Sequence, residues 1–186
     1  KIQEKGDFLE QSFKVLNEND VVIIGRLGEH SADNNKPMGS NVENFIRGAN
    51  CTVITVGEHF EPPKQFIFAY EFSTVCEKML QRIAQSDLLK QISCHLLYVG
   101  DHPQMLAEPT KYLQAAGFDV VAAYRYGDVA ENILEYQKEH DIALIVLGAF
   151  SHSKIHQFFL GSITTTIFFF SYVPLLVAKW LILQHI

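Results

Sequence analysis

The sequence has little of what a disulfide framework, a zinc site or a nucleic-acid interface requires. Its three cysteines, Cys51, Cys76 and Cys94, are an odd number without CxxC or His-paired spacing. We therefore expect buried free thiols in a reducing compartment. The 15 Lys and Arg residues are outnumbered by 21 Asp and Glu residues, the net charge is −6, and no basic run occurs. This balance argues against nucleic acid as a partner.

Long apolar runs are also missing. The most apolar stretch, residues 163–178, is interrupted by threonines, a serine and Pro174. It is shorter than the span of about 18 residues that a membrane helix needs. The first residues do not form a signal-peptide pattern. From these absences we expect a cytoplasmic protein with no membrane partner.

What the sequence does contain is an internal repeat. GDFLEQ at residues 6–11 and DVVIIG at 20–25 return as GDVAEN at 127–132 and IALIVLG at 142–148. Matched glycines lie 121 residues apart (Gly6 and Gly127), 123 apart (Gly25 and Gly148) and 122 apart (Gly39 and Gly161). So constant an offset predicts a tandem duplication.

The repeat sets the expected domain limits. Residues 1–57 match only the C-terminal half of a unit, whereas residues 64–180 hold a complete one. The stretch between them, residues 58–63, contains two prolines and reads as a linker. Residues 181–186 are expected to be a C-terminal extension.

Apolar runs of strand length alternate with helical patterns in the complete unit. The strands are expected at 65–70, 93–99, 120–124, 142–147 and 173–179, and the helices at 75–88, 103–116, 128–140 and 162–170. Such alternation predicts a doubly wound α/β fold, Rossmann-like, with a five-stranded parallel sheet in the order 3-2-1-4-5. Ligands of such sheets lie outside the carboxyl ends of the strands.

Glycines and serines follow one strand in each copy. In the second copy they are Gly148, Ser151, Gly161 and Ser162, and in the first they are Gly25, Gly28, Gly39 and Ser40. Backbone N–H groups in such a loop, at the start of a helix, can hold phosphate oxygens. The same residues also suit an ordinary turn from strand to helix, because glycine relieves strain and serine caps helices.

The loop, the alternating elements and the duplication together resemble the universal stress protein family in its tandem form. That family is marked by GxxG, nine residues, then Gly followed by Ser or Thr. Here residues 148–162 read GAFS, HSKIHQFFL and GS, and VPLLVAK follows. The likeness covers residues 64–179, together with residues 6–56 of the first copy. It implies a fold related to the adenine-nucleotide α-hydrolases.

The resemblance implies an adenine-nucleotide site, for ATP with Mg²⁺. Its residues by position are Ala69, Glu71, Val99, Gly148, Ser151, Gly161, Ser162 and Ile163 in the second unit, and Gly25, Gly28, Gly39 and Ser40 in the first. Val99 and Ile163 would contact adenine and the loop would hold the phosphates. In the alternative interpretation both residues belong to the core and Glu71 is a solvated strand end.

Three departures from the family pattern favour a protein without nucleotide. Ser151 replaces the second glycine of the motif, and Glu71 stands where the family has an aspartate. In the first copy ten residues, rather than nine, separate Gly28 from Gly39.

Other polar residues have structural interpretations. Asp7 with Glu10, and Asp128 with Glu131, have the spacing of helix N-caps. His152 and His156 lie four residues apart without a third metal ligand at suitable spacing, so we expect exposed loop histidines and no metal site. No nucleophile is paired with a general base, so no catalytic residues are assigned.

The sequence thus predicts a tandem universal stress protein that acts as a stress-response binding or signalling module. One alternative is a nucleotide-free scaffold that works through domain pairing. Another is an enzyme of the related hydrolase group, but AYEFS at residues 69–73 is not the SGGxDS-type loop that it needs. We also expect the copies to pack through their final strands, residues 50–56 against 173–179, and expect homodimerisation as a further mode of assembly.

Overall fold

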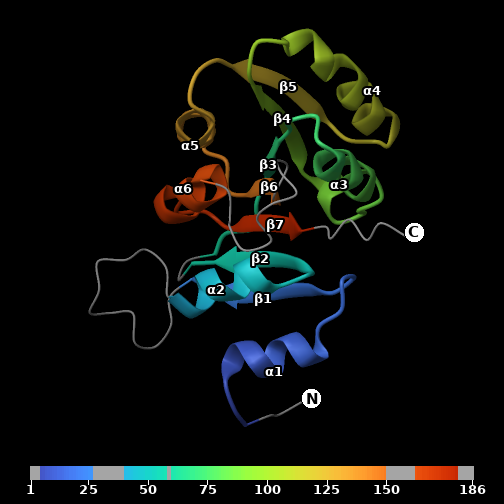
Figure 1. The fold of residues 1–186 in the computed structure, drawn as a ribbon. Helices are drawn as coiled ribbons and strands as arrows, with labels where there is room; N and C mark the ends of the chain where they lie inside the picture. Colours follow the sequence, from blue (N-terminus) through green and yellow to red (C-terminus); the bar gives the residue numbers. More distant parts are fainter. Residues whose placement is uncertain (1–4, 27–39, 58–59, 150–161, 180–186) are drawn as a thin grey trace.

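The described residues form one mixed β-sheet of seven strands with helices on both faces (Figure 1). The computed structural model describes residues 5–26, 40–57, 60–149 and 162–179. The strand order is β1-β2-β7-β6-β3-β4-β5. The strands are β1 (Val21–Gly25), β2 (Thr52–Val56), β3 (Gln65–Ala69), β4 (Ser93–Val99), β5 (Val120–Arg125), β6 (Ile145–Ala149) and β7 (Leu175–Lys179).

Helices cover both faces of the sheet, and on each face the helices and strands pack together through a separate apolar cluster. They are α1 (Phe8–Val15), α2 (Ser40–Gly48), α3 (Thr74–Ala84), α4 (Ala107–Ala115), α5 (Val129–Glu139) and α6 (Ser162–Phe170), with 3-10 turns η2 (Leu89–Gln91) and η3 (Pro103–Leu106). One cluster joins α2, α5 and α6 through residues such as Phe45, Ile133 and Phe168. The other joins α3 and α4 through Met79 and Leu113.

The α/β Rossmann-like class expected from the sequence is confirmed, but the sheet is larger than expected. Residues 65–179 supply neighbouring parallel strands in the order β5-β4-β3-β6-β7. This is the parallel order predicted for residues 64–179. The sheet then continues through β2 and β1, which that prediction did not include. The physical reason is that β7 would otherwise be an edge strand with unpaired backbone groups.

The contact between β2 and β7 is antiparallel. Val53 lies opposite Val177, Ile54 opposite Leu176 and Thr55 opposite Leu175. The sequence analysis placed residues 50–56 against residues 173–179, and β2 and β7 lie within these two segments. The two halves therefore share a continuous sheet rather than being joined only through a linker.

The first four elements have the same local geometry as the last four. Asp7 caps α1 by accepting a hydrogen bond from the Glu10 N–H at 3.0 Å, and Asp128 caps α5 by accepting from the Glu131 N–H at 2.9 Å. Both aspartates therefore have the capping role expected from the sequence. All three cysteines are free and buried, also as expected.

The strand registers repeat as well. Ile23 lies opposite Ile54 between β1 and β2, and Val146 lies opposite Leu176 between β6 and β7. At the antiparallel contact Ile54 faces Leu176, so corresponding residues of the two pairs meet. This is the register of a pseudo-two-fold axis that passes between the two strands.

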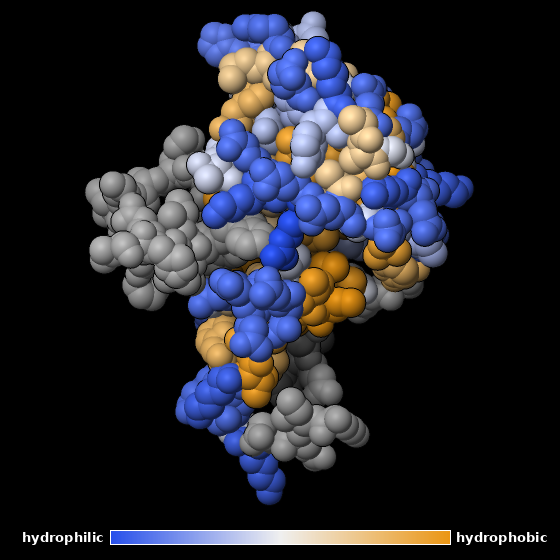
Figure 2. All heavy atoms as spheres, turned by 90° about the vertical axis from the view of Figure 1, so that its right-hand side faces the viewer, coloured by the Kyte–Doolittle hydropathy of each residue, from blue (hydrophilic) through white to orange (hydrophobic). Residues whose placement is uncertain are grey.

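The two apolar strands of the first half differ in burial. Val53 is buried against the rest of the sheet, as expected. Val21 and Ile23 on β1, however, are 58% and 67% exposed. In the view of Figure 2, apolar residues reach the surface in the lower half of the molecule, at the level of β1. Side chains alternate between the two faces of a strand. Val22 and Ile24 pack on the core, whereas neither apolar cluster of the described residues includes Val21 or Ile23.

A buried arginine joins the two halves beside the β2–β7 contact. Arg26 follows β1 and its guanidinium donates to the carbonyl oxygens of Ser171 and Val173, the latter at 2.8 Å, and weakly to the Thr55 hydroxyl at 3.4 Å. Burial lowers the pKa of Arg26 to about 10, so the side chain remains charged at neutral pH. Because its acceptors follow the C-terminus of α6, the charge is also favoured by the helix dipole.

Loss of the Arg26 side chain is predicted to destabilise the fold. In Arg26→Met the carbonyls of Ser171 and Val173 lose a charged donor, and we expect the free energy of unfolding to fall by about 2–4 kcal/mol. Denaturant unfolding measures this value. Lys138→Met, at an exposed position of α5, is the control and should change stability by about 0.5 kcal/mol or less. Equal effects of the two substitutions would show that the buried contacts contribute little.

A second buried polar network surrounds His95 of β4. Its Nδ1 lies 2.9 Å from the Tyr136 hydroxyl and its Nε2 lies 3.1 Å from Gln65 Oε1. The Gln65 amide nitrogen donates to the carbonyl of His140, which directs Oε1 towards His95. Nε2 therefore carries the proton in the neutral ring, and Nδ1 accepts from Tyr136.

The His95 network predicts a pH dependence of stability. Burial, followed by the nearby His140, lowers the pKa of His95 below 6.5, against the opposing effect of Asp119. The unfolded chain therefore binds the extra proton first, and stability should fall as the pH drops below about 6.5, by at most about 1.4 kcal/mol per pH unit from this group.

Urea unfolding between pH 7.5 and 5 tests this effect by comparing the parent chain, His95→Gln and the exposed control His102→Gln. His95→Gln should have a shallower pH slope than the parent, whereas His102→Gln should keep the parent slope. A parent slope retained in His95→Gln would assign the pH dependence to other groups.

Candidate functional site

Three strands of the second half end together at one edge of the sheet. β3 lies between β4 and β6, with Ala69 opposite both Leu97 and Leu147. The winding reverses at β3, because the chain adds β4 and β5 on one side and β6 and β7 on the other (Figure 1). Such a reversal leaves a crevice at the carboxyl edge of the sheet, where ligands of this fold class bind.

Several of the residues expected at the site meet at this edge. Ala69 ends β3, Val99 ends β4 and Gly148 is the penultimate residue of β6. Ala69 and Val99 are half-buried and pack on the apolar cluster beneath α5 and α6. Val99 is therefore part of the core and also partly accessible. A core role and a contact with adenine, the two interpretations of this residue, are compatible.

The turn after β3 holds Glu71 beside the start of α3. The Glu71 carboxylate accepts a hydrogen bond from the Ser73 hydroxyl at 3.2 Å, and the same hydroxyl accepts from the Cys76 N–H that it caps, also at 3.2 Å. Phe72 adopts a left-handed conformation with φ 59°, which turns the chain from strand to helix. Glu71 is exposed, so its remaining acceptor positions face solvent.

Gly148 has a packing role that the sequence did not reveal. A Cβ at this position would lie 3.2 Å from Cys76 Sγ and 3.3 Å from a Val75 methyl, because α3 crosses β6 closely here. Cys76 is buried, which raises the pKa of its thiol to about 11. A glycine is thus explained at this position without any ligand.

α6 begins at the same edge, after the loop that carries the sequence motif. Its first turn holds no acidic residue, so the positive end of the helix dipole is not neutralised by its own side chains. Ile163 in this turn is 39% exposed, whereas Thr164 is buried. The backbone of Ser162 starts the helix.

Part of the expected site lies outside the described residues. This applies to Ser151 and Gly161 in the second copy, Gly28 and Gly39 in the first, and the pair His152 and His156.

The first half has fewer elements around its corresponding residues. Gly25 ends β1 and Ser40 begins α2. Among the strands that the structure describes, none lies on the outer side of β1. Arg26, directly after Gly25, points into the interior and bonds the segment before β7. The described residues therefore place no counterpart of Ala69 or Glu71 beside Gly25.

Comparisons with known proteins agree with this fold. Residues 107–179 match the family model described as the universal stress protein family. A universal stress protein of Synechocystis sp. is 32% identical over 178 residues, which span 92% of this chain and 58% of that protein. The chain thus spans less than two thirds of the length of this relative.

Solved structures of low sequence identity have a similar fold. A universal stress protein from Archaeoglobus fulgidus superposes with a TM-score of 0.64 at 22% identity, over 76% of this chain and 56% of that one. A universal stress protein solved in complex with cAMP gives a TM-score of 0.54 at 19% identity, over 63% of this chain and 98% of that one.

Within the parts of the chain that the structure describes, every helix is too short or too polar to cross a bilayer. The fold is the α/β arrangement shared with these solved structures, and the family-model match covers α4 to β7. Over these residues the chain is similar to universal stress proteins.

Proposed function

We propose that this chain belongs to a tandem universal stress protein that binds an adenine nucleotide at the carboxyl edge of β3, β4 and β6. The observation that carries the proposal is the convergence of Ala69, Glu71 and Val99 with the acid-free first turn of α6. A fold neighbour in this family was solved with cAMP, which supports an adenine nucleotide as the class of ligand.

Each part of this edge has a chemical role in the proposal. The exposed Glu71 carboxylate accepts hydrogen bonds from ribose hydroxyls, since the Ser73 hydroxyl is its only hydrogen-bond partner among the described residues. The accessible sides of Val99 and Ile163 contact the adenine ring. Backbone N–H groups at the start of α6 bind phosphate, as helix N-termini do in other folds. For ATP, Mg²⁺ would bind with the phosphates and offset their charge.

The tandem arrangement is part of the same proposal. Residues 1–57 form the C-terminal half of one unit and residues 64–180 form the other. The matching caps of α1 and α5 and the matching registers of β1–β2 and β6–β7 support this division. The symmetric register of β2 and β7 supports direct pairing of the two units.

A second candidate function is a nucleotide-free scaffold that acts through this pairing. It is favoured by Gly148, whose close contact with Cys76 and Val75 gives the first glycine of the motif a structural role. Ser151 in place of the second glycine favours it too. The two functions differ in a single measurable property, the affinity for nucleotide.

Nucleotide binding is predicted to depend on the carboxyl edge of the second unit. Calorimetric titration with ATP, with and without Mg²⁺, and with cAMP measures the affinity. Gly161→Val should weaken binding by about 1–3 kcal/mol through lost backbone contacts to a charged group. Glu71→Ala should weaken it by about 1 kcal/mol through the lost ribose contacts, while the exposed control Glu18→Ala should leave it unchanged.

Two results would count against the proposal. If ATP and cAMP bind the parent chain and Gly161→Val equally well, the nucleotide lies elsewhere. If the folded parent chain binds neither nucleotide at millimolar concentration, the scaffold function is favoured. Mass spectrometry of small molecules released from freshly purified protein provides an independent check.

A further inference from the structure

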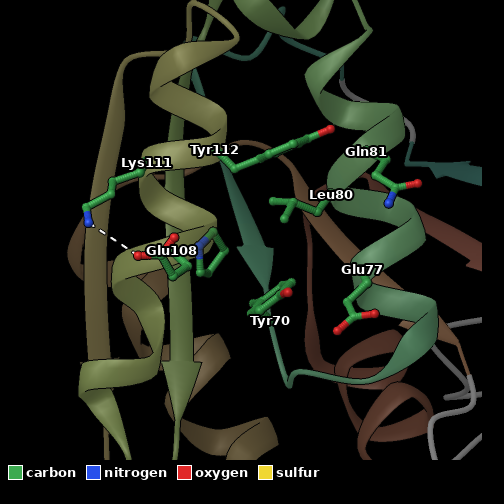
Figure 3. Close-up of a pocket in the computed structure, with 8 residues that line it drawn as sticks. Tyr70, Glu77, Leu80, Gln81, Glu108, Lys111 and Tyr112 are labelled. Atoms are coloured by element: carbon green, nitrogen blue, oxygen red, sulfur yellow. Dashed lines mark hydrogen bonds and ion pairs between the residues drawn. The ribbon is translucent and has the colours of Figure 1, made fainter.

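A groove on the opposite face of β3 has a different chemistry from the nucleotide edge. It lies between α3 and α4, has a volume of about 510 Å³, and has Tyr70 at its floor (Figure 3). α3 contributes Glu77 and Leu80, and α4 contributes Glu108, Pro109 and Tyr112. A groove of this size is within the range that small-molecule sites occupy.

The groove is separate from the residues proposed to bind nucleotide. Ala69 packs on the cluster beneath α5 and α6, whereas Tyr70 belongs to the cluster beneath α3 and α4. Adjacent residues at the end of β3 thus face opposite sides of the sheet. None of the positions assigned to the nucleotide lines the groove.

Aromatic rings form the floor and one wall. Tyr70 is 5% exposed, and its ring is held by edge contacts with Phe68 and Phe72 at centroid distances of 5.5 and 4.8 Å. Burial, and then the charge of Glu77, raises the pKa of Tyr70 to about 12, so the phenol stays neutral. Tyr112 is 46% exposed and extends from α4 towards Leu80 of α3 (Figure 3).

The charged side chains around the rings leave an excess of negative charge. Glu77 lies on the α3 side and has no ion pair among the described residues. Glu108 pairs with Lys111 at 3.2 Å, but both side chains are largely exposed, so water screens this pair. Two carboxylates and one ammonium leave a net negative charge, and the whole chain is also acidic at −6.

Tyrosine rings, apolar side chains and an unpaired carboxylate together match a particular class of ligand. Ring faces attract cations, most strongly when the cation is partly desolvated. Leu80 and Pro109 supply apolar contacts for the body of such a ligand. A phosphate or a carboxylate would instead meet the negative charge of Glu77.

We propose that the groove between α3 and α4 binds an organic cation, an ammonium or guanidinium group on a small apolar body, between Tyr70, Tyr112 and Glu77. Such a cation can come from a free small molecule or from a basic side chain of a peptide. Choline and agmatine represent the free molecules, and N-acetyl-arginine amide represents the peptide side chain.

Titration of the isotope-labelled chain, followed by NMR, tests the proposal. Choline or agmatine should shift the amide signals of α3 and α4 in a saturable way. The uncharged analogue of choline, 3,3-dimethylbutanol, should bind about tenfold more weakly because it lacks the charge. If N-acetyl-arginine amide binds more tightly than choline and agmatine, the proposal is supported, and the bound cation is assigned to a basic side chain of a peptide.

Matched variants separate the cation site from general effects. Glu77→Gln and Tyr112→Leu should each weaken binding of the cation several-fold. Tyr112→Phe keeps the aromatic ring, and Glu135→Gln removes an exposed charge from α5, outside the groove. These two control variants should bind the cation as the parent chain does. Glu77→Gln should leave the affinity for ATP unchanged, which makes this test independent of the proposed nucleotide site.

The proposal is overturned if no probe shifts the signals of α3 and α4 up to about 10 mM. Equal binding of choline and 3,3-dimethylbutanol would also overturn it, since the charge would then play no part. The same conclusion follows if Glu135→Gln weakens binding as much as Glu77→Gln does.

Discussion

The antiparallel pairing of β2 with β7 is the contact on which the rest of the structure depends. It covers the outer edge of β7 and makes one sheet from two sets of parallel strands. Val53 and Val177 are both buried there, and Phe45 of α2 shares one apolar cluster with Phe168 of α6. Arg26 strengthens the contact by bonding backbone carbonyls beyond α6. The first half thus obtains a core that it could not form alone.

This contact also determines where binding can occur. Because β2 and β7 run in opposite directions, the carboxyl ends of β1 and β2 lie at the sheet edge opposite to those of β3 to β7. Gly25 and Gly148, the matching glycines of the repeat, are therefore at opposite edges and cannot contribute to one composite site. The nucleotide proposed for the second unit would contact β3, β4, β6 and α6, while α3 and α4 form a separate groove on one face.

The sequence predicted local features well, because they depend on residues that are close together in the chain. The strand at residues 93–99, the helix at 162–170 and the capping aspartates Asp7 and Asp128 follow from periodicity and spacing. The repeat also predicted that the segment from α1 to β2 corresponds to the segment from α5 to β7. Among the site residues, the strand ends meet at one edge because the winding of the chain requires it.

Features that depend on distant neighbours could not be predicted in this way. Arg26 bonds carbonyls about 145 positions further along the chain, and the environment of His95 combines residues from three elements. The close approach of α3 to Gly148 is visible only in three dimensions, and it gives a packing reason for a glycine that the sequence associates with phosphate. Ile23 is exposed because neither apolar cluster of the described residues reaches its face of β1, which periodicity does not reveal.

Hydrogen exchange of the backbone amides tests the shared sheet most directly. If the β2–β7 contact unites the two halves, hydrogen-bonded amides of β2 and β7 should exchange as slowly as those of β3, through the same global unfolding. The three strands should then respond equally to added denaturant. Fast, denaturant-independent exchange in β1 and β2, with β3 to β6 still protected, would show that the first half opens by itself and would contradict the account.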